Sequence, residues 1–148
     1  MARKRSRTAP RTVIVHSFDH AREAARMAAS LGVPVTLRSA PGASAYAGAL
    51  WFAEMIALVR EEVPGAEIDA VLDCADAAGD AMAALRCGLK RIRFSGRGRV
   101  RARLAALAAR HGAALDDDRR QALDLGAPGV DEAGLRAWLA RGRVKTVA

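Results

Sequence analysis

Short β-branched runs alternate along the sequence with segments whose apolar residues recur at helical spacing. We expect strands at residues 12–16, 33–38, 67–74, 91–94 and 113–116. Between them, the spacing predicts a helix that Asp19 caps and further helices at residues 46–63, 76–88 and 100–111. Asp76 is expected to cap the helix at residues 76–88. After the last strand we expect two short helices, at residues 119–125 and 131–141, joined by residues 126–130.

Strands that alternate with helices are typical of an α/β domain with a parallel sheet. Four to five βα units are too few for a closed eight-stranded barrel, which takes about 200 residues or more. The sheet is therefore expected to be half of a (β/α)8 barrel or an open three-layer sheet of the flavodoxin kind, and the local pattern fits both. We assign residues 12–148 to this single α/β domain, with a basic tail at 1–11 and a helical cap at 119–148.

Composition narrows the class of protein. The 148 residues are 51% hydrophobic, which allows a core and argues against global disorder. No apolar run approaches the roughly 20 residues that a membrane span needs, and no secretory signal pattern stands at the start. With only two cysteines, Cys74 and Cys87, no disulfide framework is expected. We expect a soluble cytoplasmic protein without contact to a membrane.

The net charge of +8 is unevenly distributed along the sequence. Basic residues form a tail made of Arg3, Lys4, Arg5, Arg7 and Arg11, and a second acid-free run spans residues 81–115. Acids gather at residues 61–80 and again at Asp116–Asp118. Such a distribution favours anionic partners, nucleic acid among them, or the head-to-tail pairing of two subunits. The tail is also consistent with a plain solvated extension.

In a parallel sheet, functional residues lie at the carboxyl ends of the strands. The run Ser95-Gly96-Arg97-Gly98-Arg99 stands there, between an expected strand and an expected helix. Its glycines allow backbone amides to approach an anion, and its arginines are bidentate phosphate donors. The run predicts a phosphate or anion site, although an ordinary βα turn and an RNA contact fit the same pattern.

Asp73 ends another expected strand and is the candidate catalytic residue, as a general acid or base. The alternative is that its carboxylate binds neighbouring backbone or an arginine. The other candidates at strand ends are Asp19, Ser39, Gly42, Tyr46 and Cys74. Three histidines, His16, His20 and His111, do not have the spacing of a metal site, and we expect neither metal nor cofactor.

Taken in order, these strand ends resemble the amino-terminal half of class II (metal-dependent) ketose-bisphosphate aldolases over residues 12–115. The segments that carry the resemblance are Phe18-Asp19, Val33–Ser39, Gly42-Ala43-Ser44-Ala45-Tyr46, Leu72-Asp73-Cys74 and Ser95-Gly96-Arg97. The resemblance implies a barrel-like fold and places Asp73 at the proton-shuttling aspartate of the family. The sequence departs from the family at two positions: Cys74 replaces the first zinc-binding histidine, and Ser95 replaces the aspartate after the fourth strand.

The resemblance implies a truncated relative that has lost metal-dependent aldol cleavage and binds a phosphorylated small molecule. If it is an enzyme, it is a lyase-like relative that acts on a sugar phosphate. The alternatives are a basic accessory protein that binds nucleic acid and a structural partner subunit. Because half a barrel leaves two sheet edges and one face uncovered, we expect a homo-oligomer, unless residues 119–148 fold back over the sheet.

Overall fold

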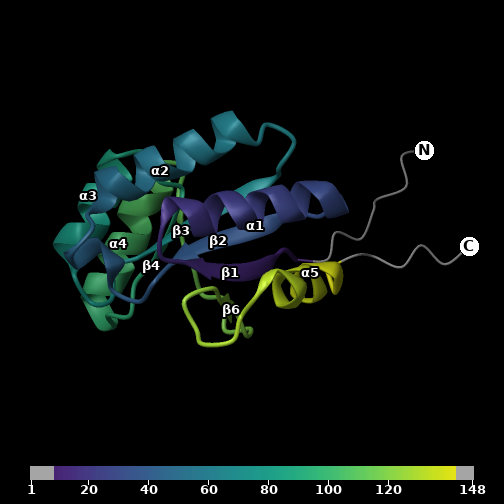
Figure 1. Ribbon diagram of the computed structural model, residues 1–148. Coiled ribbons are helices and arrows are strands. Elements are labelled where there is room, and N and C mark those ends of the chain that lie inside the picture. Colours follow the sequence, from purple (N-terminus) through teal and green to yellow (C-terminus); the bar gives the residue numbers. More distant parts are fainter. Residues whose placement is uncertain (1–8, 143–148) are drawn as a thin grey trace, which may run out of the picture.

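The computed structural model describes residues 9–142 (Figure 1). Its first half contains β1 (Arg11–Val15), α1 (Phe18–Leu31), β2 (Val35–Ser39), the 3₁₀ turn η1 (Ala43–Ala45), α2 (Ala49–Glu62), β3 (Ile68–Asp73) and α3 (Ala78–Arg86). Its second half contains β4 (Arg91–Arg93), α4 (Gly98–Arg110), β5 (Ala114–Leu115), β6 (Leu123–Asp124) and α5 (Glu132–Ala140). The expected α/β alternation is confirmed.

The strands form one six-stranded sheet in the order β5-β4-β3-β2-β1-β6, and every pairing in it is parallel. The first five strands are neighbours in the order of the sequence. A flavodoxin-like sheet reverses its strand order at a switch point, where the ligand binds. The first five strands have no such reversal, as in half a barrel, whereas the order does reverse at β6, which pairs with β1 at the opposite edge.

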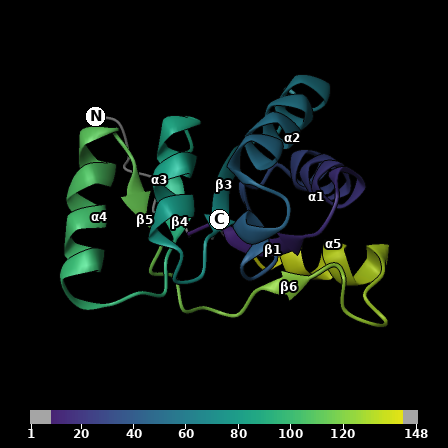
Figure 2. The same ribbon diagram turned by 90° about the vertical axis from the view of Figure 1, so that its left-hand side faces the viewer.

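The helices lie on one face of this sheet. Connections between neighbouring parallel strands are right-handed almost without exception, which places α1 to α4 on the same face. Each helix packs on the next, and α5 packs on the free side of α1. Figure 2 looks onto the carboxyl ends of the strands and shows the helices as an arc from α4 to α5. Side chains such as Leu37, Phe52, Leu72, Ile92 and Leu135 are fully buried between the two layers.

The opposite face of the sheet is polar. In β2, Thr36 and Arg38 alternate with buried Val35 and Leu37, and in β4 two arginines flank buried Ile92. We call this surface the polar face; buried Val71 lies on it among the charged and hydroxyl side chains of Thr12, Thr36, Arg38, Asp69, Asp73, Arg91 and Arg93. A closed barrel would enclose these side chains, whereas here another part of the chain covers them.

Residues 116–122 cross the polar face on their way from β5 to β6 at the opposite edge. Asp116 accepts hydrogen bonds from Arg91 and Arg93, and Arg120 donates one to the Pro10 carbonyl at 3.3 Å. Figure 2 shows this segment running beneath the strands. The crossing is possible because the segment's carboxylates neutralise the arginines of the face that it covers.

The prediction of a helix at residues 119–125 is wrong, since Leu123 and Asp124 form β6 beside β1. Helix α1 is capped by Ser17, whose hydroxyl accepts from the His20 N–H at 3.1 Å, so the cap expected at Asp19 is also wrong. Asp76 does not cap α3, which begins after Ala77 without a side-chain cap. The helix expected from residue 46 begins only at residue 49, because η1 precedes it.

The basic tail, expected at residues 1–11, ends before Arg11. Arg11 is the first residue of β1, and its guanidinium lies 4.5 Å from the centre of the Trp138 ring. The other basic residues of the tail, Arg3, Lys4, Arg5 and Arg7, lie outside the described residues. Within the described part of the chain, no helix has the length and apolar character of a membrane span.

The long uncovered edges from which a homo-oligomer was expected are absent from the described sheet. The two edge strands, β5 and β6, are two residues long, and residues 116–122 lie across the polar face. Short edge strands offer little backbone for pairing with a second sheet. An oligomer is still a prediction, but it needs another surface.

Candidate functional site

A cavity of about 320 Å³ opens at the carboxyl ends of β3, β4 and β5. It is lined by Asp73, Arg93, Phe94, Ser95, Gly96, Arg97, Arg101, Asp116, Asp117 and Arg119. Two groups of residues expected from the sequence, Asp73 and residues 95–97, are therefore brought together. Gly98 and Arg99, the first two residues of α4, do not line the cavity, so this part of the expected anion site lies outside it.

Asp73 is held by the backbone of two loops. Its Oδ1 accepts hydrogen bonds from the N–H groups of Gly42 at 3.0 Å and Ala75 at 2.9 Å. Its own N–H donates to Ser39 Oγ at 2.9 Å. The other carboxylate oxygen, Oδ2, lies 3.8 Å from Arg93 Nε. Asp73 thus joins the loops that follow β2 and β3, which agrees with the structural alternative for this residue.

The loop after β4 fits closely around Phe94. A Cβ atom at Gly96 would lie 2.3 Å from Cζ of the Phe94 ring, so any other residue there would displace this buried side chain. Gly98 has a φ of 66°, a value that favours glycine. The Ser95 N–H donates to the Ala75 carbonyl at 2.7 Å. The two glycines therefore serve the close turn that brings residues 95–97 to the cavity.

Asp116 forms the anionic floor of the cavity. Its side chain is only 3% exposed, and it accepts hydrogen bonds from Arg91 and from Arg93 Nη1, the latter at 2.9 Å. Arg93 also donates to the Asp118 carbonyl at 2.8 Å, and Arg91 pairs with Asp69 at 2.7 Å. These charges compensate one another, so Arg93 is committed to the protein and not free for a ligand.

Arg97 and Arg119 differ from these arginines. Both line the cavity and are exposed, and neither forms an ion pair or a hydrogen bond with a described residue. Arg97 also stands at the N-cap position of α4, where no side chain caps the first N–H groups. Two unpaired guanidinium groups therefore line the same cavity, and one of them, that of Arg97, comes directly before an uncapped helix start.

Positive charge also lies behind the cavity, at Arg38. Burial, together with the nearby charge of Arg93, lowers the pKa of Arg38, although Asp116 and Asp73 partly offset both effects. No described residue forms an ion pair with Arg38. Sequence reasoning missed Arg38, Arg93, Asp116 and Arg119. The usable signal was the alternation of arginines around Ile92, which turns both of them away from the core.

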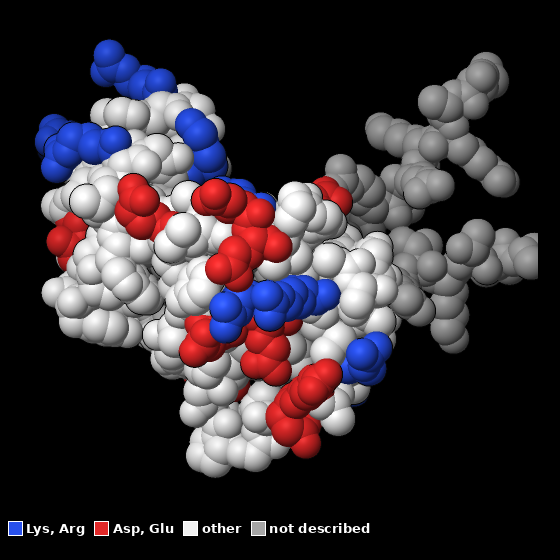
Figure 3. Space-filling view, turned by 45° about the horizontal axis from the view of Figure 1, so that its top comes forward, with Lys and Arg blue, Asp and Glu red and all other residues white. Residues whose placement is uncertain are grey.

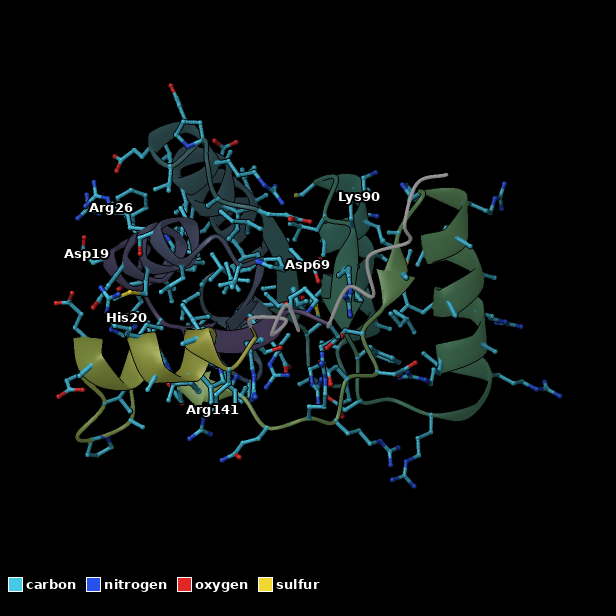
Figure 4. The ribbon with its side chains drawn as sticks, turned by 90° about the vertical axis from the view of Figure 1, so that its right-hand side faces the viewer. Asp19, His20, Arg26, Asp69, Lys90 and Arg141 are labelled. Carbon is cyan, nitrogen blue, oxygen red and sulfur yellow. The ribbon has the colours of Figure 1, made fainter. Side chains whose placement is uncertain are left out.

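The other candidates at strand ends are dispersed. Asp19 pairs with Arg22 at 2.7 Å on α1, and Tyr46 is 72% exposed. Figure 4 shows Asp19 beside α1, well away from Asp69 of the polar face. Ser39 and Gly42 reach the site only through their hydrogen bonds to Asp73. Cys74 is buried, and this burial raises the pKa of its thiol to about 11.

His16 and His20 lie side by side at the start of α1. Their ring centres are 5.8 Å apart, and His16 Nε2 lies 2.6 Å from Asp124 Oδ1. Burial acts to raise the pKa of Asp124, but hydrogen bonds from His16 and the Gly126 N–H outweigh it and lower the pKa. Within residues 9–142, no three His, Cys, Asp or Glu side chains are grouped as a metal site requires.

Asp118 makes the stability of residues 116–122, the segment that crosses the polar face, depend on pH. Hydrogen bonds from the Arg120 side chain lower the pKa of Asp118 to about 2. A carboxyl whose pKa is lower in the folded than in the unfolded state stabilises the fold above about pH 4 and loses this effect as the pH falls toward 2. We expect Arg120→Ala to move the NMR titration midpoint of Asp118 up toward its ordinary value. Arg119→Ala is the control, and an unchanged midpoint in Arg120→Ala would contradict the assignment.

No protein-family model and no curated protein matches this sequence. The chemistry of the cavity has to be inferred from the residues that form it.

Proposed function

We propose that this chain is an aldolase-like, half-barrel domain that binds a phosphorylated small molecule in the cavity beside β4. The observation that carries the proposal is the pair of exposed arginines, Arg97 and Arg119, which line the cavity without an ionic partner among the described residues. Arginine binds phosphate through two parallel N–H donors, which gives both strength and orientation. The location at the carboxyl ends of the strands is where barrel-related folds bind their ligands.

The start of α4 adds to this preference for an anion. The first N–H groups of a helix have no partner within the helix, and the helix dipole favours negative charge there. In α4 the N-cap residue, Arg97, accepts no hydrogen bond from these N–H groups through its side chain. Gly96, which lines the cavity, lets the backbone turn closely before the helix. A phosphate group bound by the Arg97 guanidinium would lie close to this helix start, whose dipole favours the negative charge.

The size of the cavity limits the ligand. A volume of about 320 Å³ lies at the lower end of the range for small-molecule sites. A sugar phosphate of a few carbon atoms fits this space, and the exposed Asp117 carboxylate at its rim can accept a hydrogen bond from a hydroxyl group. These features support a small phosphorylated polyol more than a nucleotide.

Metal-dependent aldol cleavage is not part of the proposal. The residues do not fit a zinc site, because Cys74, at the position of the family's histidine, is 1% exposed and bonded at 4.0 Å to the Leu72 carbonyl. Burial raises the pKa of this thiol to about 11, which makes the thiolate that a zinc ligand must be more costly to form. Asp73 Oδ1 is occupied by two N–H groups. We therefore propose that the chain binds a phosphorylated small molecule and does not catalyse aldol cleavage.

Calorimetric titration of the full chain with dihydroxyacetone phosphate, inorganic phosphate and a short oligonucleotide tests this proposal. We expect saturable binding of the sugar phosphate, tighter than that of inorganic phosphate. Arg97→Ala and Arg119→Ala should each weaken it about tenfold or more, because each removes a charged hydrogen bond. Arg86→Ala, an exposed arginine on α3, is the matched control. Binding of the oligonucleotide alone, lost at high salt, would favour a nucleic-acid protein instead.

A further inference from the structure

The outer side of α2 combines exposed apolar side chains with unpaired acids. Leu50 is 63% and Leu58 is 51% exposed, although leucine is among the residues most often buried. Glu54 and Glu61 lie on the same side of the helix and form no ion pair with a described residue. We call this surface the acidic α2 face, made of Leu50, Glu54, Ala57, Leu58 and Glu61. It has the composition of an unoccupied interface.

The outer side of α4 is its counterpart in charge. Arg99, Arg103 and Arg110 are exposed there, and none forms an ion pair with a described residue. Exposed Ala106 lies between Arg103 and Arg110, so that a neighbouring backbone can approach closely. We call this surface the basic α4 face, made of Arg99, Arg103, Ala106 and Arg110.

The two faces match in spacing. Glu54, Ala57 and Glu61 stand at positions i, i+3 and i+7, which share one side of a helix. Arg103, Ala106 and Arg110 have the same spacing on α4. Two helices packed along these stripes place alanine against alanine, with an acid opposite a base on either side.

One copy cannot bring its own two faces together. Helix α3 packs between α2 and α4, and Figure 2 shows α4 at one end of the arc of helices. In Figure 3, acidic side chains gather in the middle of the side where α1 and α2 lie, while basic side chains protrude at the end formed by α3 and α4. Partners for both faces must therefore come from outside the chain.

We infer that the basic α4 face of one copy docks on the acidic α2 face of a second copy. A second copy supplies both the charge and the spacing that each face lacks. A nucleic acid would satisfy only the basic α4 face, because Glu54 and Glu61 repel phosphates. Exposed ion pairs contribute little by themselves, so the burial of Leu50 and Leu58 has to supply part of the affinity.

Such a contact is head to tail, because different surfaces of the two copies meet. Each copy in a pair keeps one face free, and further copies can add to it. The mean mass should therefore rise with concentration above the 15.6 kDa of one chain. It should fall as salt screens the exposed charges.

Sedimentation equilibrium of the full chain, freed of nucleic acid by nuclease treatment, tests the inference through charge reversal. Glu54→Lys/Glu61→Lys and Arg103→Glu/Arg110→Glu should each weaken association about a hundredfold, because each makes like charges face each other. Mixing the two double variants should restore association. The four substitutions in one chain should restore it as well. Folding of each variant is checked by its circular dichroism.

Glu23→Lys/Glu132→Lys is the matched control, since it reverses two exposed acids on α1 and α5 by the same change in charge. It should leave the association constant unchanged. A wild-type chain that stays monomeric at low salt would overturn the inference, as would association only after an oligonucleotide is added. Equal loss in the control, or failure of the mixture to associate, would overturn it too.

Discussion

Replacing Asp116 by alanine is expected to lower the free energy of unfolding by about 3 kcal/mol, because removal of one partner leaves buried or half-buried charges uncompensated. The Asp116 carboxylate is 3% exposed and bonds to Arg91 and Arg93, whose side chains are about one third exposed. Water reaches these two arginines in part, which keeps the expected loss at the lower end of the range for buried pairs. Urea unfolding followed by circular dichroism measures it.

The neighbouring aspartate provides the control. Asp117 also pairs with an arginine, Arg101, but its side chain is 77% exposed. Exposed pairs contribute about 0–1 kcal/mol, so Asp117→Ala should change the unfolding free energy by no more than this. A similar small loss in both variants would mean that Asp116 does not hold residues 116–122 on the polar face.

Most elements of the fold could be predicted because each has a local cause. Buried strands such as β1 and β3 are short apolar runs, and α1 repeats its alanines at helical spacing. The strand order could not be predicted, since a half barrel and a doubly wound sheet share the same local alternation. It depends on where each helix returns the chain, which is a property of packing between elements.

Strand β6 shows where a local pattern fails. It has two residues, Leu123 and Asp124, and nothing in residues 119–125 indicates a strand by itself. It exists because the Leu125 N–H donates to the Ile14 carbonyl at 3.1 Å and because Asp124 binds His16. The free edge of β1 therefore defines this strand, and a partner more than a hundred residues away leaves no local signal.

The candidate site was predictable to the extent that it follows from strand ends. Asp73 is the last residue of β3 and Ser95 follows β4 after Phe94, and parallel strands bring such residues to one edge of the sheet. Arg119 could not be assigned this way. It reaches the cavity because the segment after β5 turns across the polar face, and that path depends on Asp116 binding Arg91 and Arg93 of β4.

Replacing Trp138 by alanine is expected to have the largest effect on stability, about 3–5 kcal/mol, as for other buried tryptophans. The Trp138 side chain is buried on α5, and its Nε1–H donates to the Thr12 carbonyl at 3.1 Å. Arg11 stacks over its ring. The substitution removes the main anchor between α5 and β1. Urea unfolding measures the loss, and hydrogen exchange of the α1 amides shows whether α5 has detached.

Trp51→Ala is the control that distinguishes the loss of the anchor between α5 and β1 from the loss of an indole ring at the surface. Trp51 is 43% exposed, so its replacement should cost within about 1 kcal/mol, as at other surface positions. Trp138→Phe keeps an aromatic ring and removes the N–H, and its cost should fall between those of the two alanine variants. If Trp138→Ala were no worse than Trp51→Ala, α5 would contribute nothing to the sheet. Among the described helices α5 packs on the free side of α1, so the β1 edge would then depend mainly on β6, and two residues of pairing are too few to hold it.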